Sequence, residues 1–120
     1  MRRLSFAALL CLYYSLSGAQ TIEHVISSPD KKIVVNCSVE KATYTISYQG
    51  KTILQNSRLG IVREDEDFSK DLRLTKALPI VPVKDSYTIL TAKRSSVTYL
   101  AGKMVLQTTN SSGDKMNIIF

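Results

Sequence analysis

Short runs in which apolar and polar side chains alternate are the feature that most constrains the fold of this chain. The run from Thr43 to Tyr48 alternates strictly, because its two tyrosines and Ile46 are separated by hydroxyl side chains. Successive side chains of an extended strand point to opposite faces of a sheet, so this pattern predicts a half-buried β-strand. The turn residues Gln49-Gly50-Lys51 and the apolar stretch after them predict a β-hairpin.

Most of the remaining chain has the same character. Extended segments are expected at residues 21–26, 31–40, 72–83, 87–90, 103–109 and 115–120, and a turn at 110–114 joins the last two into a hairpin. Pro79 and Pro82 lack a backbone donor, so their segment is expected at a sheet edge or in a crossing. The stretch 95–100 is ambiguous, and no window shows sustained helical periodicity. Many short strands between turns are typical of a sandwich or barrel, and we predict an all-β sandwich.

The last predicted strand is apolar and has no turn or polar tail after it. It reads Asn117-Ile118-Ile119-Phe120. Such a strand at an exposed edge leaves unpaired backbone groups that favour aggregation. We therefore expect a sandwich that is incomplete at its C-terminus, with residues 20–120 forming a truncated N-terminal domain.

The beginning of the sequence has the order of charge, apolar run and small residues that defines a secretory leader. Arg2 and Arg3 precede the apolar stretch Leu4–Leu12, and Ser17-Gly18-Ala19 supplies small residues for a cut after Ala19. The apolar stretch is shorter than the about 20 residues that a membrane-spanning helix needs. Residues 1–19 are therefore predicted to be a signal peptide, and the mature chain to be exported to the periplasm or the extracellular space, without a membrane partner.

The charge distribution argues against nucleic acid as a partner. Removal of the leader takes away Arg2 and Arg3 and lowers the formal net charge from +6 to +4. The remaining lysines and arginines alternate with apolar residues, as they do on the solvent face of a sheet. Nucleic-acid-binding proteins instead gather such charges in a patch.

Cys37 is the one cysteine of the predicted mature chain, which excludes an internal disulfide. It lies in phase with Ile33, Val35 and Val39, and this predicts a small buried hydrophobe on a strand. A nucleophilic cysteine needs a base, and the single histidine, His24, lies outside the better-defined strands. A catalytic Cys–His pair is therefore disfavoured.

The acidic run Glu64-Asp65-Glu66-Asp67 is the most prominent candidate for chemistry. Paired carboxylates bind Ca²⁺ or act as acid and base. However, adjacent residues of an extended chain point alternately to opposite sides, and the run lacks the ligand spacing and central glycine of a calcium loop. We expect a solvated loop.

Tyrosines are the other candidates, because aromatic rings can stack on sugars. The four considered are Tyr44, Tyr48, Tyr87 and Tyr99. Tyr44 and Tyr48 share a face with Ile46, so we expect both to pack in the core with their hydroxyls at its rim.

Other site patterns are weak. The chain has no glycine-rich phosphate loop, no metal-ligand spacing of Cys and His, and no Ser–His–Asp set. We therefore predict no catalytic, cofactor-binding or metal-binding residue in this chain. Asn36-Cys37-Ser38 and Asn110-Ser111-Ser112 match the acceptor pattern for N-glycosylation, although the first falls within a predicted strand.

A series of segments resembles the N-terminal domain of glycoside hydrolase family 97. Ser28–Ile33 is similar to that family's "SPDGKI", and Tyr44–Leu54 to its "YSVSYKGKTVL" hairpin. Ser57–Ile61 is similar to "SPLGL", with Arg58 in place of proline, and Val83–Thr88 to "VDETYT". The end of the chain, 113–120, resembles a strand that in the family continues into "RAYDDGVAFRY". The resemblance spans nearly all of the mature chain in order, and it is loose at 78–83 and 96–102.

The resemblance implies a mutarotase-like β-super-sandwich packed against a (β/α)₈ catalytic barrel of the same protein. The family's enzymes are secreted, cleave α-glucosidic or α-galactosidic bonds, and bind Ca²⁺ through carboxylates that lie downstream of the matched region. The chain is therefore expected to be the non-catalytic N-terminal part of such an α-glucosidase or α-galactosidase, which supports the barrel and contributes to binding α-linked carbohydrate. The alternative is a stand-alone periplasmic or surface β-sandwich that binds sugar or protein. By itself the chain is not expected to be an enzyme.

Overall fold

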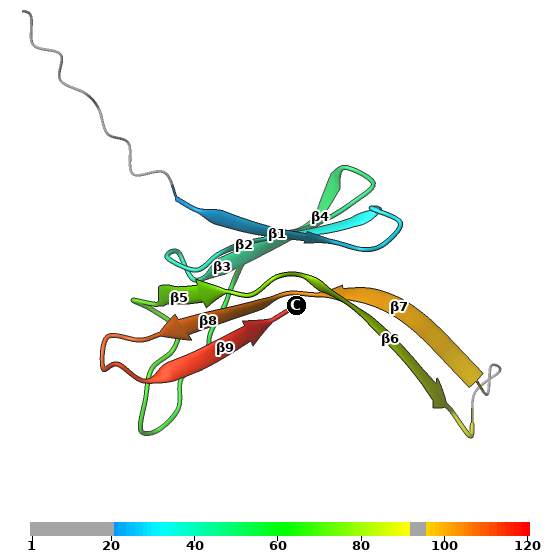
Figure 1. Ribbon diagram of the computed structural model, residues 1–120. Helices are drawn as coiled ribbons and strands as arrows, with labels where there is room; N and C mark the ends of the chain where they lie inside the picture. The colour runs from blue at the N-terminus through cyan, green and yellow to red at the C-terminus, as the bar shows by residue number, and fades with distance from the viewer. Residues whose placement is uncertain (1–20, 92–95) are drawn as a thin grey trace, which may run out of the picture.

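The computed structural model describes residues 21–91 and 96–120, and every regular element among them is a β-strand (Figure 1). The predicted signal peptide, residues 1–19, lies outside the described part of the chain. The strands are β1 (Glu23–Ser27), β2 (Ile33–Ser38), β3 (Thr43–Tyr48), β4 (Lys51–Arg58), β5 (Arg73–Ala77), β6 (Val81–Thr88), β7 (Ser96–Lys103), β8 (Val105–Thr109) and β9 (Lys115–Ile119).

The first four strands form an antiparallel meander in the order β1-β2-β3-β4. The bounds predicted for β3 are confirmed, and β3 pairs with β4 as expected. Gln49 and Gly50 both have positive φ angles, 48° and 80°. A two-residue hairpin turn with positive φ at both central residues matches the right-handed twist of the strands that it joins.

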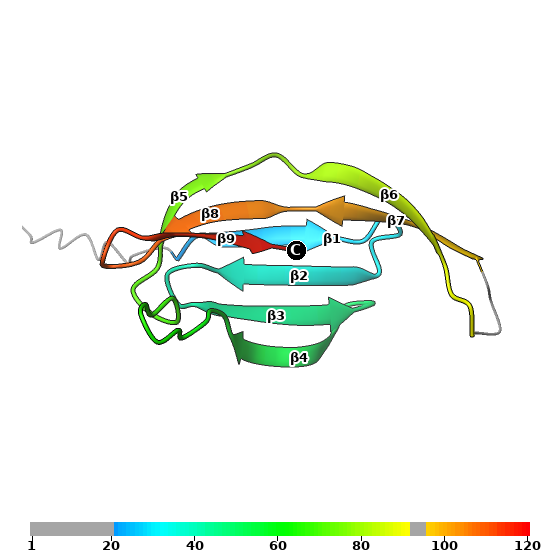
Figure 2. The ribbon, with the colours of Figure 1, turned by 90° about the horizontal axis from the view of Figure 1, so that it is seen from below.

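The remaining strands form a second, strongly bent layer. β5, β8 and β9 make one sheet in the order β5-β8-β9, and β6 pairs with β7 along their whole length. The chain passes from β5 to β6 through residues 78–80 and from β7 to β8 through Met104, so the two sheets share one long hairpin (Figures 1 and 2). The β6–β7 hairpin, called the arm below, projects beyond the first sheet (Figure 2).

The arm is where the predicted strand bounds are corrected. The expected segment 72–83 is interrupted at 78–80, and β6 continues to Thr88, which includes half of the segment expected at 87–90. Residues 96–100 of the ambiguous stretch belong to β7, and residue 95 lies outside the described residues. Pro82 lies in β6, which among the described strands pairs with β7 alone, so the prediction of an edge position for this proline is confirmed.

The core lies between the meander and the β5-β8-β9 sheet, which makes the described chain a β-sandwich (Figure 1). Ile26, Cys37 and Val39 face inward from the meander side, and Met104, Leu106 and Ile118 meet them from the other layer, all buried. Burial of a Leu or Ile side chain contributes about 1.5–3 kcal/mol, so these contacts hold the layers together. The predicted inner face is thus confirmed for Val35 and Cys37 of β2 and for Val39 just after it, whereas Ile33, expected on the same face, is 45% exposed.

The loop between β4 and β5 closes one end of the sandwich. Its Phe68 and Leu72 are buried in the core. Phe68 donates a backbone hydrogen bond of 2.8 Å to the carbonyl of Ile61. This bond brings the two sides of the loop together beside Gly60. Gly60 has a φ of 109°, and a Cβ there would lie 2.1 Å from the Phe68 carbonyl oxygen, so only glycine fits. No helix within residues 21–91 and 96–120 is long and apolar enough to cross a membrane.

Candidate functional site

The acidic run lies in the loop that closes the sandwich, and its carboxylates are bound locally rather than gathered. Asp65 forms an exposed 2.7 Å ion pair with Arg63. Asp67 accepts hydrogen bonds from the backbone and hydroxyl of Ser69, and these two bonds are the main reason that the pKa of the Asp67 carboxyl lies below its ordinary value. The run therefore acts as a loop-forming element, as predicted.

Glu66 has a structural role of its own. Its Oε2 accepts a hydrogen bond of 2.8 Å from Nδ2 of Asn110, a buried residue at the start of the β8–β9 turn. Among the described residues, no group of three or more His, Cys, Asp or Glu side chains is placed to hold a metal ion. The described part of the chain thus offers no fit for the calcium ion that the family resemblance implies.

The register of β1 and β2 brings His24 directly opposite Cys37, a pairing that the sequence did not predict. Cys37 has no exposed surface, and its burial raises the pKa of the thiol to about 11. Nucleophilic cysteines have the opposite shift, because the thiolate is the reactive form. Cys37 is therefore a core residue, and its nearness to His24 does not make a catalytic pair.

The four tyrosines lie in two different environments. Tyr44 packs against the core, with its ring centroid 5.9 Å from that of Phe120, as predicted. Tyr48 is 43% exposed, so the expectation that it packs in the core is wrong. The physical reason is its position at the end of β3, opposite the equally exposed Ile33, where the second layer no longer covers the meander.

The two glycosylation patterns also differ in the structure. Nδ2 of Asn110, the atom to which a glycan would be attached, is engaged with Glu66, and the side chain is buried. Asn36 faces away from the core on β2, where it lies opposite Thr45. The folded sandwich can present Asn36 to a modifying enzyme, whereas Asn110 is enclosed.

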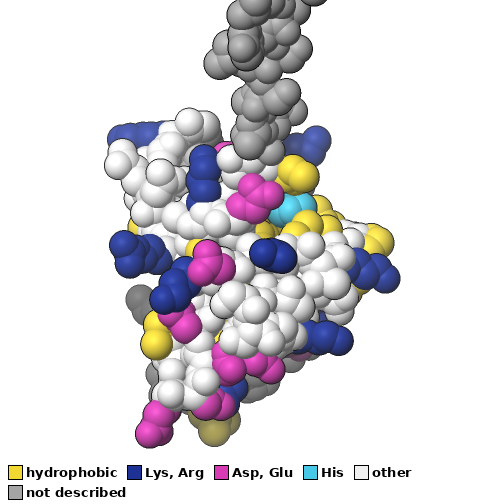
Figure 3. All heavy atoms as spheres, turned by 90° about the vertical axis from the view of Figure 1, so that its left-hand side faces the viewer, with side chains coloured by type: hydrophobic (Ala, Val, Ile, Leu, Met, Phe, Trp, Pro, Cys, Tyr) yellow, Lys and Arg dark blue, Asp and Glu magenta, His cyan; other side chains and the backbone are white. Residues whose placement is uncertain are grey.

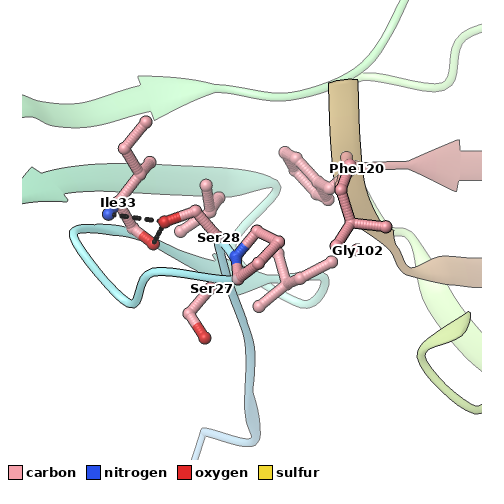
Figure 4. Close-up of a pocket in the computed structure, with 10 residues that line it drawn as sticks. Ser27, Ser28, Ile33, Gly102 and Phe120 are labelled. Atoms are coloured by element: carbon pink, nitrogen blue, oxygen red, sulfur yellow. Dashed lines mark hydrogen bonds between the residues drawn. The ribbon is translucent and has the colours of Figure 1, made fainter. Parts of the chain in front are cut away.

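An apolar cleft opens between the meander and the arm (Figure 4). It has a volume of about 270 Å³, and its apolar walls come from β1, β2, β7 and the C-terminal residue, with Ile26, Ile33, Val35, Leu100, Gly102 and Phe120. At its rim, Ser28 Oγ accepts a hydrogen bond of 3.0 Å from the backbone of Ile33 and donates one of 2.6 Å to Asp30. The side chain of Leu100 is 57% exposed in this cleft.

The opposite face of the arm is apolar as well. Tyr87 and Tyr99 pack edge to face there, with ring centroids 6.4 Å apart, and both remain more than 40% exposed. Val81 on the same face is 48% exposed. The side of the arm towards the cleft is mixed, because Leu100 lies opposite Lys84 there and Thr98 lies opposite Ser86. An isolated two-stranded hairpin is also marginally stable in water. The cleft and the face of the arm that carries Tyr87 and Tyr99 therefore form a candidate interface.

The end of the sandwich that carries the acidic loop has a different surface. In Figure 3, lysines, arginines and acidic side chains are interspersed over this face, with small apolar areas between them. Such mixed charge is typical of a surface that stays in water. The candidate interface thus lies at the arm end of the molecule.

Comparisons with known proteins point to one family. Residues 26–120 match the family model described as glycosyl-hydrolase 97 N-terminal. The crystal structure of a β-arabinopyranosidase is 33% identical, with a TM-score of 0.74, over 81% of this chain and 16% of that chain. Structures of a glycoside hydrolase family 97 enzyme from Pseudoalteromonas sp. strain K8, in complex with panose and with acarbose, share the fold at 21% identity and a TM-score of 0.64, over 80% of this chain and 15% of theirs. No curated protein matches the sequence.

Proposed function

Because the chain belongs to the glycosyl-hydrolase 97 N-terminal family, we propose that it is the non-catalytic N-terminal β-sandwich of a longer, secreted glycosidase, called the parent below. In the parent it supports the catalytic domain, which the family resemblance describes as a (β/α)₈ barrel. The substrate class is an α-glucoside, an α-galactoside or an arabinopyranoside, the last suggested by the 33% identical β-arabinopyranosidase.

One observation carries this proposal. The family match covers residues 26–120, which is nearly the whole sandwich, yet the chain spans only 16% of the β-arabinopyranosidase. Most of such a protein therefore lies outside the part that resembles this chain. In the acidic loop, Asp65 pairs with Arg63 and Glu66 binds Asn110, so these carboxylates are engaged in structural contacts. Together with the exposed apolar side chains of the arm, this supports a role in contact between domains rather than in catalysis.

Export and calcium binding belong to the same proposal. Residues 1–19 have the pattern of a secretory leader and would direct the parent out of the cytoplasm. The calcium ion expected in the parent would be bound by residues downstream of this chain, because the calcium-binding carboxylates of the family that it resembles lie there.

The test is to read the gene beyond the codon for Phe120 and to express both the parent and residues 20–120. The parent is expected to hydrolyse one nitrophenyl glycoside of the three classes, and residues 20–120 none. Turnover by residues 20–120 that is lost in Glu64→Gln or Asp67→Asn would instead make the sandwich a small enzyme.

Carbohydrate binding by the sandwich itself is a second candidate, and a polar hollow on the outer face of the meander favours it. The hollow has a volume of about 270 Å³ and is lined by Asn36, Thr45, Ser47, Thr52, Gln55 and Asn56. Amide and hydroxyl groups of this kind hydrogen-bond to sugars. Saturable retention of residues 20–120 on an immobilised α-glucan, reduced in Asn56→Ala, would support this function and the stand-alone alternative.

A further inference from the structure

The pairing of β9 runs directly towards a free strand edge. Beyond the last residue of β9, Phe120 still pairs with Met104: its N–H donates to the Met104 carbonyl at 3.0 Å, and Met104 N–H donates to the Phe120 carbonyl at 2.8 Å. Past Met104 the same long strand continues as β7, away from β9. Within residues 21–91 and 96–120, β7 pairs with β6 alone.

The hydrogen-bonding direction of this edge follows from strand geometry. The carbonyl of Val105 accepts a bond from Leu78, on the β5–β6 side, whereas Met104 bonds to Phe120 on the other side. Backbone groups alternate in direction along an extended strand. The N–H and C=O groups of Gly102, Leu100 and Thr98 therefore point to the side on which β9 lies, and they form a template for another strand.

The apolar cleft lies beside this edge, and Leu100 and Gly102 of the edge strand line it. Phe120 faces the core and forms one wall of the cleft, and Gly102 forms another. In the antiparallel register of Phe120 with Met104, the second residue after Phe120 would lie opposite Gly102, on the inner face. Because Gly102 has no side chain, an incoming side chain can approach the backbone there and contact Ile80 and Ile26, whose atoms lie 3.5 and 3.6 Å from the position of a Cβ.

We propose that the segment immediately after Phe120 in the parent prolongs β9 along the free edge of β7 and places an apolar side chain, its second, in the cleft opposite Gly102. This inference rests on the proposed function, because it needs a parent that continues beyond this chain. The register favours this occupant over a second copy, since the Met104–Phe120 pair already aligns the two strands and covalent linkage gives a high effective concentration. The added strand would also turn the two-stranded arm into part of a three-stranded sheet.

A disulfide trap in the parent tests the register. Met104 and Phe120 exchange both of their hydrogen bonds, so Lys103 and the first residue after Phe120 would form the next, non-hydrogen-bonded pair, with Cα atoms about 4.5 Å apart. This spacing allows a disulfide. Lys103→Cys combined with cysteine at that position is expected to give an intramolecular link under mild oxidation, detected by peptide mass.

The matched control moves one cysteine by two residues. Ala101→Cys with the same second cysteine places the pair on a diagonal of about 7–8 Å, and no link is expected. A second variant probes the cleft: Gly102→Leu should lose most of the Lys103→Cys link by occupying the space, whereas Gly102→Ala should keep it, because an added Cβ meets its nearest atoms at 3.5 and 3.6 Å.

The outcomes separate this inference from the proposed function. A parent that hydrolyses glycosides but forms no Lys103→Cys link, or links Ala101→Cys equally well, overturns the strand pairing and leaves the function intact. A link between two molecules instead of within one would make a second copy the occupant and also overturns it. A gene that stops after Phe120 would contradict both the strand pairing and the proposed function.

Discussion

Asn110 and Glu66 are joined by a 2.8 Å hydrogen bond across 44 residues of sequence. The same Asn110 side chain accepts a bond of 2.8 Å from the backbone of Asp114, so one buried amide holds both the β8–β9 turn and the acidic loop. This is the contact by which the loop is fixed to the second sheet.

We expect Asn110→Ala to lower the free energy of unfolding of residues 20–120 by about 1–3 kcal/mol, because it removes a buried amide and both of its hydrogen bonds, to Glu66 and Asp114. Urea denaturation followed by circular dichroism measures the change. Ser111→Ala, at the neighbouring exposed position, is the control and should change it by less than about 0.5 kcal/mol. Equal effects of the two variants would show that the amide bonds contribute little.

A second prediction compares two glycines with positive φ. Gly60→Ala should destabilise the sandwich by more than about 3 kcal/mol, because its Cβ would lie 2.1 Å from the Phe68 carbonyl oxygen and the loop must move. Gly50→Ala has a φ of 80° but no atom within 4 Å of the new Cβ, so it should cost only about 1–2 kcal/mol of conformational strain. Thermal denaturation of both variants gives the comparison, and equal losses would contradict the close approach at Gly60.

A third prediction concerns pH. The pKa of Cys37 is raised from 9.0 to about 11 by burial, so above pH 9 the unfolded chain loses this proton and the folded chain keeps it. Folding stability should therefore fall between pH 9 and pH 11, by at most about 1.4 kcal/mol per pH unit from this group.

Other groups titrate in the same range, so the measurement is the difference between the original chain and Cys37→Ala. Urea midpoints at several pH values should decline less steeply for the variant. Parallel declines would mean that the thiol ionises as easily in the folded state. In agreement with the shift, Cys37 should react with a thiol reagent at pH 8 only after denaturation.

A fourth prediction uses two leucines on the inner side of the same long hairpin. Leu106 has no exposed surface, and Leu106→Ala should cost about 2–5 kcal/mol. Leu100 is 57% exposed in the cleft, so Leu100→Ala should cost less than about 0.5 kcal/mol in residues 20–120. In the parent, resistance of the arm to proteolysis should fall in Leu100→Ala if the cleft is covered there, and an unchanged cleavage rate would argue that the cleft stays open.

The strands of the meander could be predicted from the sequence because each is specified locally. β3 alternates strictly and is followed by a Gln-Gly turn, and its bounds are as expected. The arm could not be predicted in the same way. Its strands alternate in part, because Tyr87 and Tyr99 lie on one face and Lys84, Ser86 and Thr98 on the other. The pattern is interrupted where Pro82 lies opposite Gly102 and where Leu100 falls on the polar face, so the bounds of the strands were not marked.

The cleft was missed for a different reason. Its walls come from β1, β2, β7 and Phe120, which are brought together by the packing of the two layers and not by any local motif. A single signal was present: Gly102 within an extended segment often marks a close approach of another chain. The pairing of His24 with Cys37 likewise depends on the register of β1 and β2, which sequence patterns alone do not define.

The strand order has a consequence for synthesis of the protein. All neighbours in the meander are consecutive in sequence, so this sheet can form once Arg58 has been translated. The residues that cover its apolar face, Met104 to Ile118, are made later, and at about 5–20 residues per second the delay is on the order of several seconds. During that interval the nascent sheet exposes Cys37 and Val39 to other ribosome-bound chains. A chaperone that keeps the first half unfolded until the second half is complete should therefore raise the yield of folded protein.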